Sequence, residues 1–247
     1  MKIGIISAMR EEMQELLHEL QNVRVHHKGK RDYYEGILFG KEVVLVFSRW
    51  GKVASAVTTT QLINDFELDE IIFTGVAGAL NAELNIGDIV IGKTLFQHDM
   101  DASPLYPKFE IPLLNQQGFE TVSNQHLIDA TKDFLNNFTQ LIPTEKAATF
   151  KIIRPKMIKG TILSGDQFIS SKEKIESLLK QIPQADCVEM EGAAIAQVCF
   201  EYNIPFSIIR IISDKAMDNS HIDFQKFADE IASHYAKAIL KNYFSQI

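Results

Sequence analysis

The sequence predicts an α/β protein in which helices cover a buried sheet. Short runs rich in β-branched residues alternate along the chain with longer amphipathic stretches, which is the pattern of this class. The chain has 247 residues and is 46% hydrophobic, so it can bury a core without disulfide or metal staples. We find no linker and no internal repeat, and therefore expect one domain spanning residues 1–247.

Short apolar runs predict the strands. The run KIGIIS opens the chain as a buried strand, and two further runs that meet at Gly40 indicate a hairpin. A later run, EIIFT, leads into the glycine-rich segment GVAG. The predicted strands cover residues 2–7, 34–39, 41–47, 70–74, 88–91, 161–164, 187–189 and 206–212.

Longer stretches with apolar residues three or four positions apart predict the helices. The first places Met13, Leu16 and Leu20 on one side, and a later one has Asn124 or Ser123 as its N-cap. The predicted helices cover residues 9–20, 52–64, 124–138, 171–181, 192–202 and 223–244. Residues 99–118 contain prolines and show no clear period, so we expect a long irregular loop with a functional or interface role.

Charge and composition exclude several kinds of partner. Lys and Arg number 25 against 32 Asp and Glu, and no basic stripe is visible, so we expect no nucleic-acid partner. No apolar run approaches the roughly 20 residues that span a bilayer, so we expect no membrane partner. The first apolar run is too short for a signal peptide, which favours the cytoplasm.

The metal-binding residue types show no ligand pattern. Cys187 and Cys199 match neither CxxC nor a zinc-knuckle spacing and are expected to be buried, reduced thiols. His98, Asp99 and His221 lack a third ligand at a fixed spacing. We therefore expect no metal site.

Unusual residues follow four of the predicted strands, and ligands of open α/β sheets bind beyond such carboxyl ends. SAMREE at residues 7–12 puts acidic residues in a first helical turn, where the helix dipole stabilises them. TGVAGA at residues 74–79 allows close approach of a backbone or ligand, but it lacks the GxGxxG fingerprint of dinucleotide sites. RIISDKA at residues 210–216 ends a strand in Ser-Asp. The aspartate at this position could be a helix cap, a turn former or a catalytic acid.

The fourth segment, CVEMEGAA at residues 187–194, carries two carboxylates on either side of a methionine. In extended backbone, Glu189 and Glu191 point to the same face and repel each other when both are ionised. This pair therefore requires a compensating partner or a function.

Together these segments resemble the bacterial 5′-methylthioadenosine/S-adenosylhomocysteine nucleosidases of the nucleoside phosphorylase superfamily. GIISAMREEM, SRWGKVASA, FTGVAGAL, NIGDIV, SGDQFI, VEMEGAAIAQVC and RIISDKA occur in that family's order over nearly the whole chain. The resemblance implies a three-layer α/β/α sandwich around a central mixed, partly closed β-sheet. It also implies a small-molecule nucleoside substrate, no cofactor, and a homodimer in which a loop of one subunit closes the pocket of the other.

The resemblance also implies roles for individual residues. Glu12 would activate water as the base, and Asp214, steadied by Ser213, would protonate the departing purine. Glu191 would hold the ribose hydroxyls, with Met190 packed beneath the sugar. Phe168 would stack on adenine, Ile169 would offer backbone hydrogen bonds to its edge, and the other implied substrate contacts are Met9, Val76, Ala77, Gly78, Arg210 and Phe224.

These roles are chemically coherent. Cleavage of an N-glycosidic bond passes through an oxocarbenium-like transition state, which nearby carboxylates stabilise. Asp214 would need burial or a neighbouring carboxylate to keep its proton near neutral pH. A carboxylate at Glu12 would repel a phosphate nucleophile, which favours a hydrolase over a phosphorylase.

Two other activities and one other class remain open at this stage. The chain could be a 6-amino-6-deoxyfutalosine hydrolase, or a purine nucleoside phosphorylase of the same fold. A nucleoside-binding protein without catalysis is disfavoured, because binding alone needs neither Glu12 nor Asp214. Val76, Trp50 and Leu105 depart from the commonest family pattern, so the breadth of accepted 5′-substituents stays open.

Overall fold

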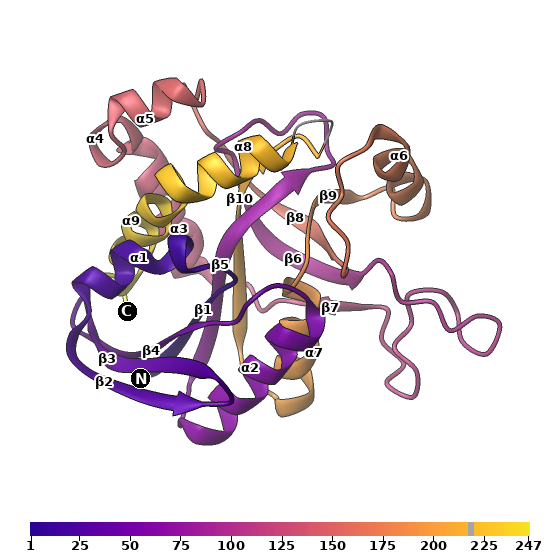
Figure 1. The fold of residues 1–247 in the computed structure, drawn as a ribbon, viewed down its shortest axis with the longest axis horizontal. Coiled ribbons are helices and arrows are strands. Elements are labelled where there is room, and N and C mark those ends of the chain that lie inside the picture. The colour runs from indigo at the N-terminus through magenta and orange to yellow at the C-terminus, as the bar shows by residue number, and fades with distance from the viewer. Residues whose placement is uncertain (217–219) are drawn as a thin grey trace.

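The strands form one mixed sheet, and part of it closes into a barrel (Figure 1). The computed structural model describes residues 1–216 and 220–247, with side-chain detail omitted for residues 220–223. Within these residues the sheet has ten strands. They are β1 (Lys2–Ser7), β2 (Gln21–Lys28), β3 (Arg31–Leu38), β4 (Lys41–Phe47), β5 (Glu70–Ala79), β6 (Ile89–Gln97), β7 (Gly118–Glu120), β8 (Met157–Ser164), β9 (Ala185–Glu189) and β10 (Phe206–Asp214).

The barrel is the ring β10-β6-β8-β9-β5, which closes because β10 also pairs with β5. The β10–β5, β6–β8 and β8–β9 pairs are parallel, whereas β10–β6 and β5–β9 are antiparallel. The remaining strands extend the sheet from β5 through β1, β4 and β3 to β2, and β7 pairs with β6. The prediction of a mixed, partly closed sheet is confirmed.

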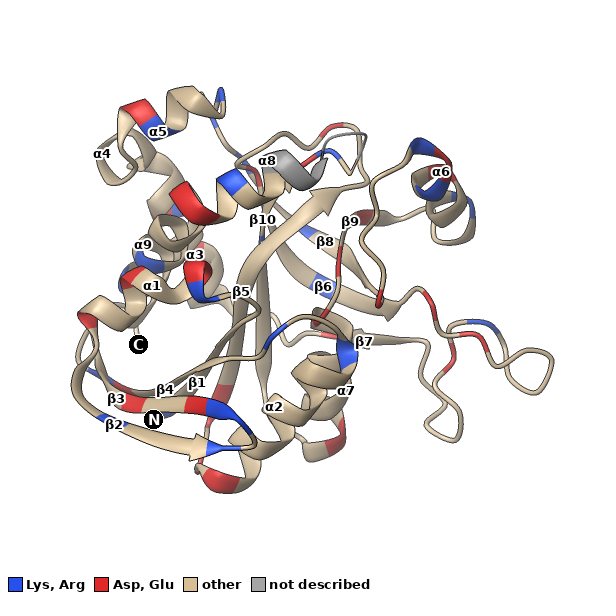
Figure 2. Cartoon of the chain, in the orientation of Figure 1, with Lys and Arg blue, Asp and Glu red and all other residues tan. Residues whose placement is uncertain are grey.

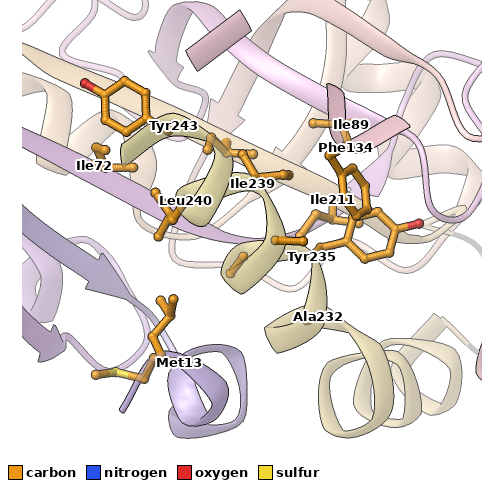
Figure 3. Close-up of a cluster of buried hydrophobic side chains, with 14 of the residues drawn as sticks. Met13, Ile72, Ile89, Phe134, Ile211, Ala232, Tyr235, Ile239, Leu240 and Tyr243 are labelled. Atoms are coloured by element: carbon orange, nitrogen blue, oxygen red, sulfur yellow. The ribbon is translucent and has the colours of Figure 1, made fainter. Parts of the chain in front are cut away.

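Helices cover both faces of this sheet (Figure 1). On one face α1 (Arg10–Glu19) and α3 (Gln125–Asn136) pack against α9 (Ser233–Phe244), and on the other α2 (Lys52–Asp65) packs against α7 (Gly192–Tyr202). The apolar cluster under α9 includes Phe134, Ile211 and Tyr235, all with an exposed fraction below 2% (Figure 3). Shorter elements are α4 (Phe138–Leu141), α5 (Thr144–Thr149), α6 (Lys172–Gln181), α8 (Ser220–Phe227) and the π-helical turn η1 (Ala228–Ala232).

Several predicted elements match the structure closely. The first strand and the strand at 41–47 have the predicted bounds, as does the helix Gly192–Tyr202. Asn124 is the N-cap of α3 and accepts a hydrogen bond from the Leu127 N–H at 3.1 Å. Ser171 caps α6 in the same way. These are the elements whose local sequence agrees with their place in the fold.

Other predictions were incomplete or wrong. The strand predicted at 70–74 continues through the glycine-rich segment to Ala79, because pairing with β10 and β9 keeps that backbone extended. The helix predicted at 223–244 begins at Ser220 and is interrupted by η1. β2, β7, α4 and α5 were not predicted from the sequence. β2 is exposed at almost every position, and its only apolar residues are Val23 and Val25, too few to predict a strand.

Charged residues are distributed over the surface rather than gathered. In the coloured part of the chain, Lys and Arg are interspersed with Asp and Glu along helices and loops (Figure 2). Among the described residues, no helix is both long and apolar enough to cross a bilayer.

Candidate active site

The ends of several strands meet around one pocket. Ser7 ends β1, Ser164 ends β8 and Asp214 ends β10, and the pairing register sets Asp214 beside Gly78 on β5. The pocket encloses about 580 Å³, part of it open to solvent. Its lining residues are Ala8, Met9, Glu12, Trp50, Val76, Ala77, Gly78, Gln167, Phe168, Ile169, Val188, Glu189, Met190, Glu191, Asp214 and Phe224.

Glu12 lies in the first turn of α1, and its carboxylate folds back over the start of the helix. Oε2 accepts hydrogen bonds from the backbone N–H of Ala8 (2.9 Å) and Met9 (3.0 Å), and Oε1 accepts one from Val76 (3.0 Å). The side chain is only 3% exposed. Burial raises the pKa of Glu12 to about 7, although Arg210 and the three N–H donors partly oppose the shift. A carboxylate with this pKa can accept a proton near neutral pH.

Gly75 gives Glu12 and Arg210 room to approach β5. A Cβ at this position would lie 2.7 Å from Glu12 Oε1 and 2.7 Å from Arg210 Nη1. Such distances are too short for any real side chain, so the glycine is needed for close approach rather than for an unusual φ.

Arg210 is the partner that the Glu189–Glu191 pair requires. Its Nη2 lies 2.7 Å from Glu189 Oε2, and both side chains are almost completely buried. The guanidinium also lies over the Phe73 ring, 3.7 Å from its centroid. Glu189 in addition accepts hydrogen bonds from the N–H groups of Glu191 (3.1 Å) and Gly192 (2.8 Å). Glu189 is therefore satisfied within the protein and fixes the turn that presents Glu191.

Glu191 is the second carboxylate directed at the pocket. Its Oε1 accepts a hydrogen bond from the Gly51 N–H at 2.8 Å, and it is 5% exposed. Burial, followed by the neighbouring charge of Glu189, raises the pKa of Glu191. The side chain can accept hydrogen bonds from a polar ligand that replaces the water it has lost.

Asp214 lies at the end of β10 and lines the pocket. Ser213 donates its hydroxyl to Oδ2 at 2.8 Å, and the Ala216 N–H donates to Oδ1 at 2.7 Å. Asp214 is 3% exposed. These contacts fix the orientation of the carboxyl toward the cavity.

Three aromatic rings line the open side of the pocket. Phe168 contacts Phe224 edge to face, with their centroids 5.8 Å apart, and Trp50 meets Phe224 at 6.1 Å. Trp50 is 54% exposed and Phe168 39%. Exposed faces of this kind suit a planar, apolar ligand.

The structure brings nearly all the residues that the sequence singled out to this pocket. Ser213 and Arg210 do not line it: Ser213 supports Asp214, and Arg210 lies behind Glu189. Sequence reasoning did not select the lining residues Ala8, Gln167 and Val188, although each lies inside a quoted motif. Their place within one or two residues of a selected position was the signal that could have found them.

Of the three candidate metal ligands, the structure describes the side chains of His98 and Asp99. Among the described residues, no group of three or more His, Cys, Asp or Glu side chains could hold a metal ion. His98 is buried beside the loop that carries Phe168, and His221 lies outside the residues with described side chains.

Comparison with known proteins identifies the class. The family model of the phosphorylase superfamily matches residues 2–245, so the chain belongs to the phosphorylase superfamily. Within it, the chain is 38% identical over 231 residues to the 5′-methylthioadenosine/S-adenosylhomocysteine nucleosidase of Staphylococcus saprophyticus, an alignment that covers 93% of each chain. The family and fold predicted from the motifs are thus confirmed.

Solved structures agree with this assignment. The nucleosidase of the same name from Neisseria meningitidis, in complex with methylthio-immucillin-A, is 34% identical with a TM-score of 0.83, over 100% of this chain and 99% of that one. The futalosine hydrolase of Helicobacter pylori is also 34% identical, with a TM-score of 0.82, over 100% of this chain and 98% of that one.

Proposed function

We propose that this protein hydrolyses the N-glycosidic bond of 5′-methylthioadenosine and S-adenosylhomocysteine, releasing adenine and the 5-thio-substituted ribose. The observation that carries the proposal is the pair of buried carboxyls, Glu12 and Asp214, in one pocket with an aromatic wall. The names of the relatives at 34–38% identity support the same activity.

In this proposal Glu12 is the general base. It takes a proton from a water molecule, whose oxygen forms the new bond to the anomeric carbon of the ribose. The bond from that carbon to the purine nitrogen breaks, and its electron pair leaves with the purine. Asp214 delivers a proton to the departing base, and Ser213 keeps its carboxyl oriented.

Glu191 is proposed to bind the ribose hydroxyls, with Met190 beneath the sugar. As the glycosidic bond breaks, positive charge develops on the ribose, and the carboxylates of the pocket stabilise it in a site with little water. Phe168 is proposed to stack on the purine, Ile169 to bind its edge, and Phe224 to cover the ribose and the 5′-substituent. The remaining contacts are assigned to Met9, Val76, Ala77 and Gly78, which line the same pocket.

The positions of the arginines favour water over phosphate as the nucleophile. Arg210 is buried and engaged by Glu189, and Arg10 is exposed and lines a different cavity. A phosphate in this pocket would therefore meet the Glu12 carboxylate with no arginine of the pocket wall to bind it.

The test is adenine release from methylthioadenosine by the purified protein, with and without inorganic phosphate. We expect the same rate in both conditions and free methylthioribose as the second product. Strict dependence on phosphate, with a sugar phosphate as product, would show a phosphorylase instead.

Hydrolysis of 6-amino-6-deoxyfutalosine is the second candidate. Trp50 at the mouth of the pocket provides an exposed ring against which an aromatic 5′-substituent could pack, and the similarity to the futalosine hydrolase of Helicobacter pylori supports it. Comparing kcat/KM for methylthioadenosine, S-adenosylhomocysteine and aminofutalosine separates the two candidates.

We further propose a homodimer and a cytoplasmic location. Exposed apolar side chains on the long loop, Leu105 (84%) and Leu113 (86%), support a protein partner, and a second copy of this chain is the partner that the family resemblance implies. The two cysteines are free and buried, in keeping with a reducing compartment.

A further inference from the structure

The N-terminus of α2 connects Glu191 with the loop that carries Phe168. Its N-cap, Gly51, has no side chain to cap the helix. Instead the Gly51 N–H donates to Glu191 Oε1, and the next amide, Lys52 N–H, donates to Asp166 Oδ1, both at 2.8 Å. Two consecutive backbone amides are thus bound by a carboxylate of the proposed ribose side and by one from the loop that carries Phe168.

A closed ring of contacts reinforces this connection. The Asp166 N–H donates to Asp99 Oδ2 at 2.9 Å, and Asp99 Oδ1 accepts from Lys52 Nζ at 2.6 Å. Lys52 and Asp99 are only 17% and 18% exposed, so solvent weakens this ion pair less than it weakens a fully exposed one. Lys52 thereby holds Asp166 in two ways, through its own amide and through Asp99.

Close packing at Gly165 and Gly51 also fixes the loop that carries Phe168. Gly165, which precedes Asp166, packs against the imidazole of His98 so closely that a Cβ at position 165 would overlap the ring. Gly51 has a φ of +93°, and a Cβ there would lie 2.9 Å from Asp166 Oδ1. Both ends of the connection therefore require glycine, which allows the loop, the helix and the ion pair to approach closely.

We propose that Lys52, Asp99 and Asp166 are positioning residues. They hold the purine-binding loop, residues 165–169, at a fixed position relative to Glu191. The inference rests on the proposed function, because it assigns purine to Phe168 and ribose to Glu191. None of the three side chains lines the pocket, so their effect on the reaction passes through the backbone of the loop and of the α2 N-terminus.

The position of the loop relative to Glu191 matters because the reaction needs the purine and the ribose to be held correctly at the same time. A misplacement of about 1 Å can lower a rate by about a hundredfold even when each part still binds. In this proposal adenine alone contacts the loop but not Glu191, whereas the intact nucleoside contacts both. Displacement of the loop relative to Glu191 should therefore reduce turnover of the nucleoside much more than affinity for adenine.

The experiment measures kcat/KM for methylthioadenosine and the inhibition constant of adenine in matched variants. Lys52→Met removes the ammonium but keeps the amide that binds Asp166. Asp99→Asn removes the charge and keeps one of the two oxygens, which can still accept from the Asp166 N–H. We expect each to lower kcat/KM about tenfold or more, and to change the adenine constant by less than about threefold. Both changes remove the Lys52–Asp99 ion pair, so the double variant should lose much less than the product of the two single losses. Lys52→Arg should keep most of the activity, because it keeps the charge at this position.

Lys2→Met is the matched control. Lys2 forms a similar half-buried ion pair with Glu35, at 2.8 Å, at the start of β1 and away from the pocket. It should leave both constants unchanged, and all variants should unfold within a few degrees of the wild type, because such pairs contribute about 1 kcal/mol or less.

Two results would overturn the positioning role: unchanged kcat/KM in Lys52→Met and Asp99→Asn, or an adenine constant that worsens as much as kcat/KM falls. The latter would mean that the loop has only lost its structure. Wild-type turnover is measured first; its absence would contradict the proposed function, and the inference with it.

Discussion

Glu12 shows how one residue can combine a structural and a proposed chemical role. Its carboxylate satisfies two amides at the start of α1 and one on β5, and burial raises its pKa to about 7. The folded state thus holds the proton more tightly than the unfolded state, where the pKa is near 4.5. The stability contributed by the neutral carboxyl is present below about pH 4.5 and is lost as the pH rises through about 7. The group that can act as a base at neutral pH is therefore one that costs the fold some stability there.

This pKa predicts the pH dependence of the reaction. The base form of Glu12 decreases as the pH falls below about 7, so kcat/KM for methylthioadenosine should fall about tenfold per pH unit on the acid side. Glu12→Gln should lower kcat by about 10²–10⁴ and remove this limb of the profile. Steady-state kinetics over a range of pH provide the measurement.

Glu11→Gln is the control for this prediction. Glu11 is the adjacent carboxylate in the same helical turn, but it lines a different cavity. It should keep the wild-type rate and pH profile. A Glu12→Gln enzyme with full activity would remove Glu12 from the mechanism.

At the residue scale, sequence reasoning found the chemical groups but not their partners. It recognised that Glu189 and Glu191, as like charges on one face, needed compensation. It could not identify Arg210 as the compensating residue for Glu189, because that contact depends on β9 and β10 both pairing with β5. Local spacing carries no information about such a pairing.

At the scale of elements, Gly75 on strand β5 allows Glu12 and Arg210 to approach the sheet closely. Gly75→Ala would push a methyl group against Glu12 Oε1 and Arg210 Nη1, both at 2.7 Å. We expect kcat/KM to fall at least about tenfold, because the carboxylate must move from its three amide donors. Overpacking should lower the free energy of unfolding by about 1–3 kcal/mol. Kinetics and thermal denaturation test both expectations.

Gly92→Ala on β6 is the matched change. Its Cβ would lie 3.2 Å from Ile162 Cδ1, 3.4 Å from Ile208 Cβ and 3.6 Å from the Ile208 carbonyl oxygen, with no pocket carboxylate among these nearest atoms. It should affect stability without a comparable loss of kcat/KM. Equal kinetic losses in the two variants would mean that general distortion of the barrel, rather than displacement of Glu12, explains the effect.

The elements that sequence reasoning missed share a physical cause. β2 is an exposed edge strand with only two apolar residues, Val23 and Val25, and its pairing with β3 alone defines it. The long terminal helix was predicted as one element because its apolar period continues, and the periodicity does not reveal that η1 interrupts the α-helical hydrogen bonds. In both cases the local apolar pattern does not show how the backbone is hydrogen-bonded.

At the scale of the whole molecule, the fold brings together residues from both ends of the chain. Glu12 follows the first strand and Asp214 ends the last, and they share a pocket because β1 and β10 both pair in parallel with β5. The sequence motifs implied this meeting only through resemblance to a family. That residues 1–247 form a single domain stays a prediction.

The long loop between β6 and β7 extends away from the body of the molecule, on the side opposite α4 and α5 (Figure 1). Leu105 and Leu113 on this loop are more than 80% exposed, which is unfavourable unless another surface covers them. We therefore expect a mass of about twice 27.9 kDa by light scattering.

Leu105→Asp should shift the protein toward the monomer and lower kcat/KM, because the loop of one subunit is proposed to close the pocket of the other. Ile153→Asp, at an equally apolar and exposed position just after α5, should leave mass and activity unchanged. A wild-type protein that is monomeric and fully active at assay concentration would contradict the dimer, and with it the shared pocket, while leaving the assignments of Glu12 and Asp214 intact.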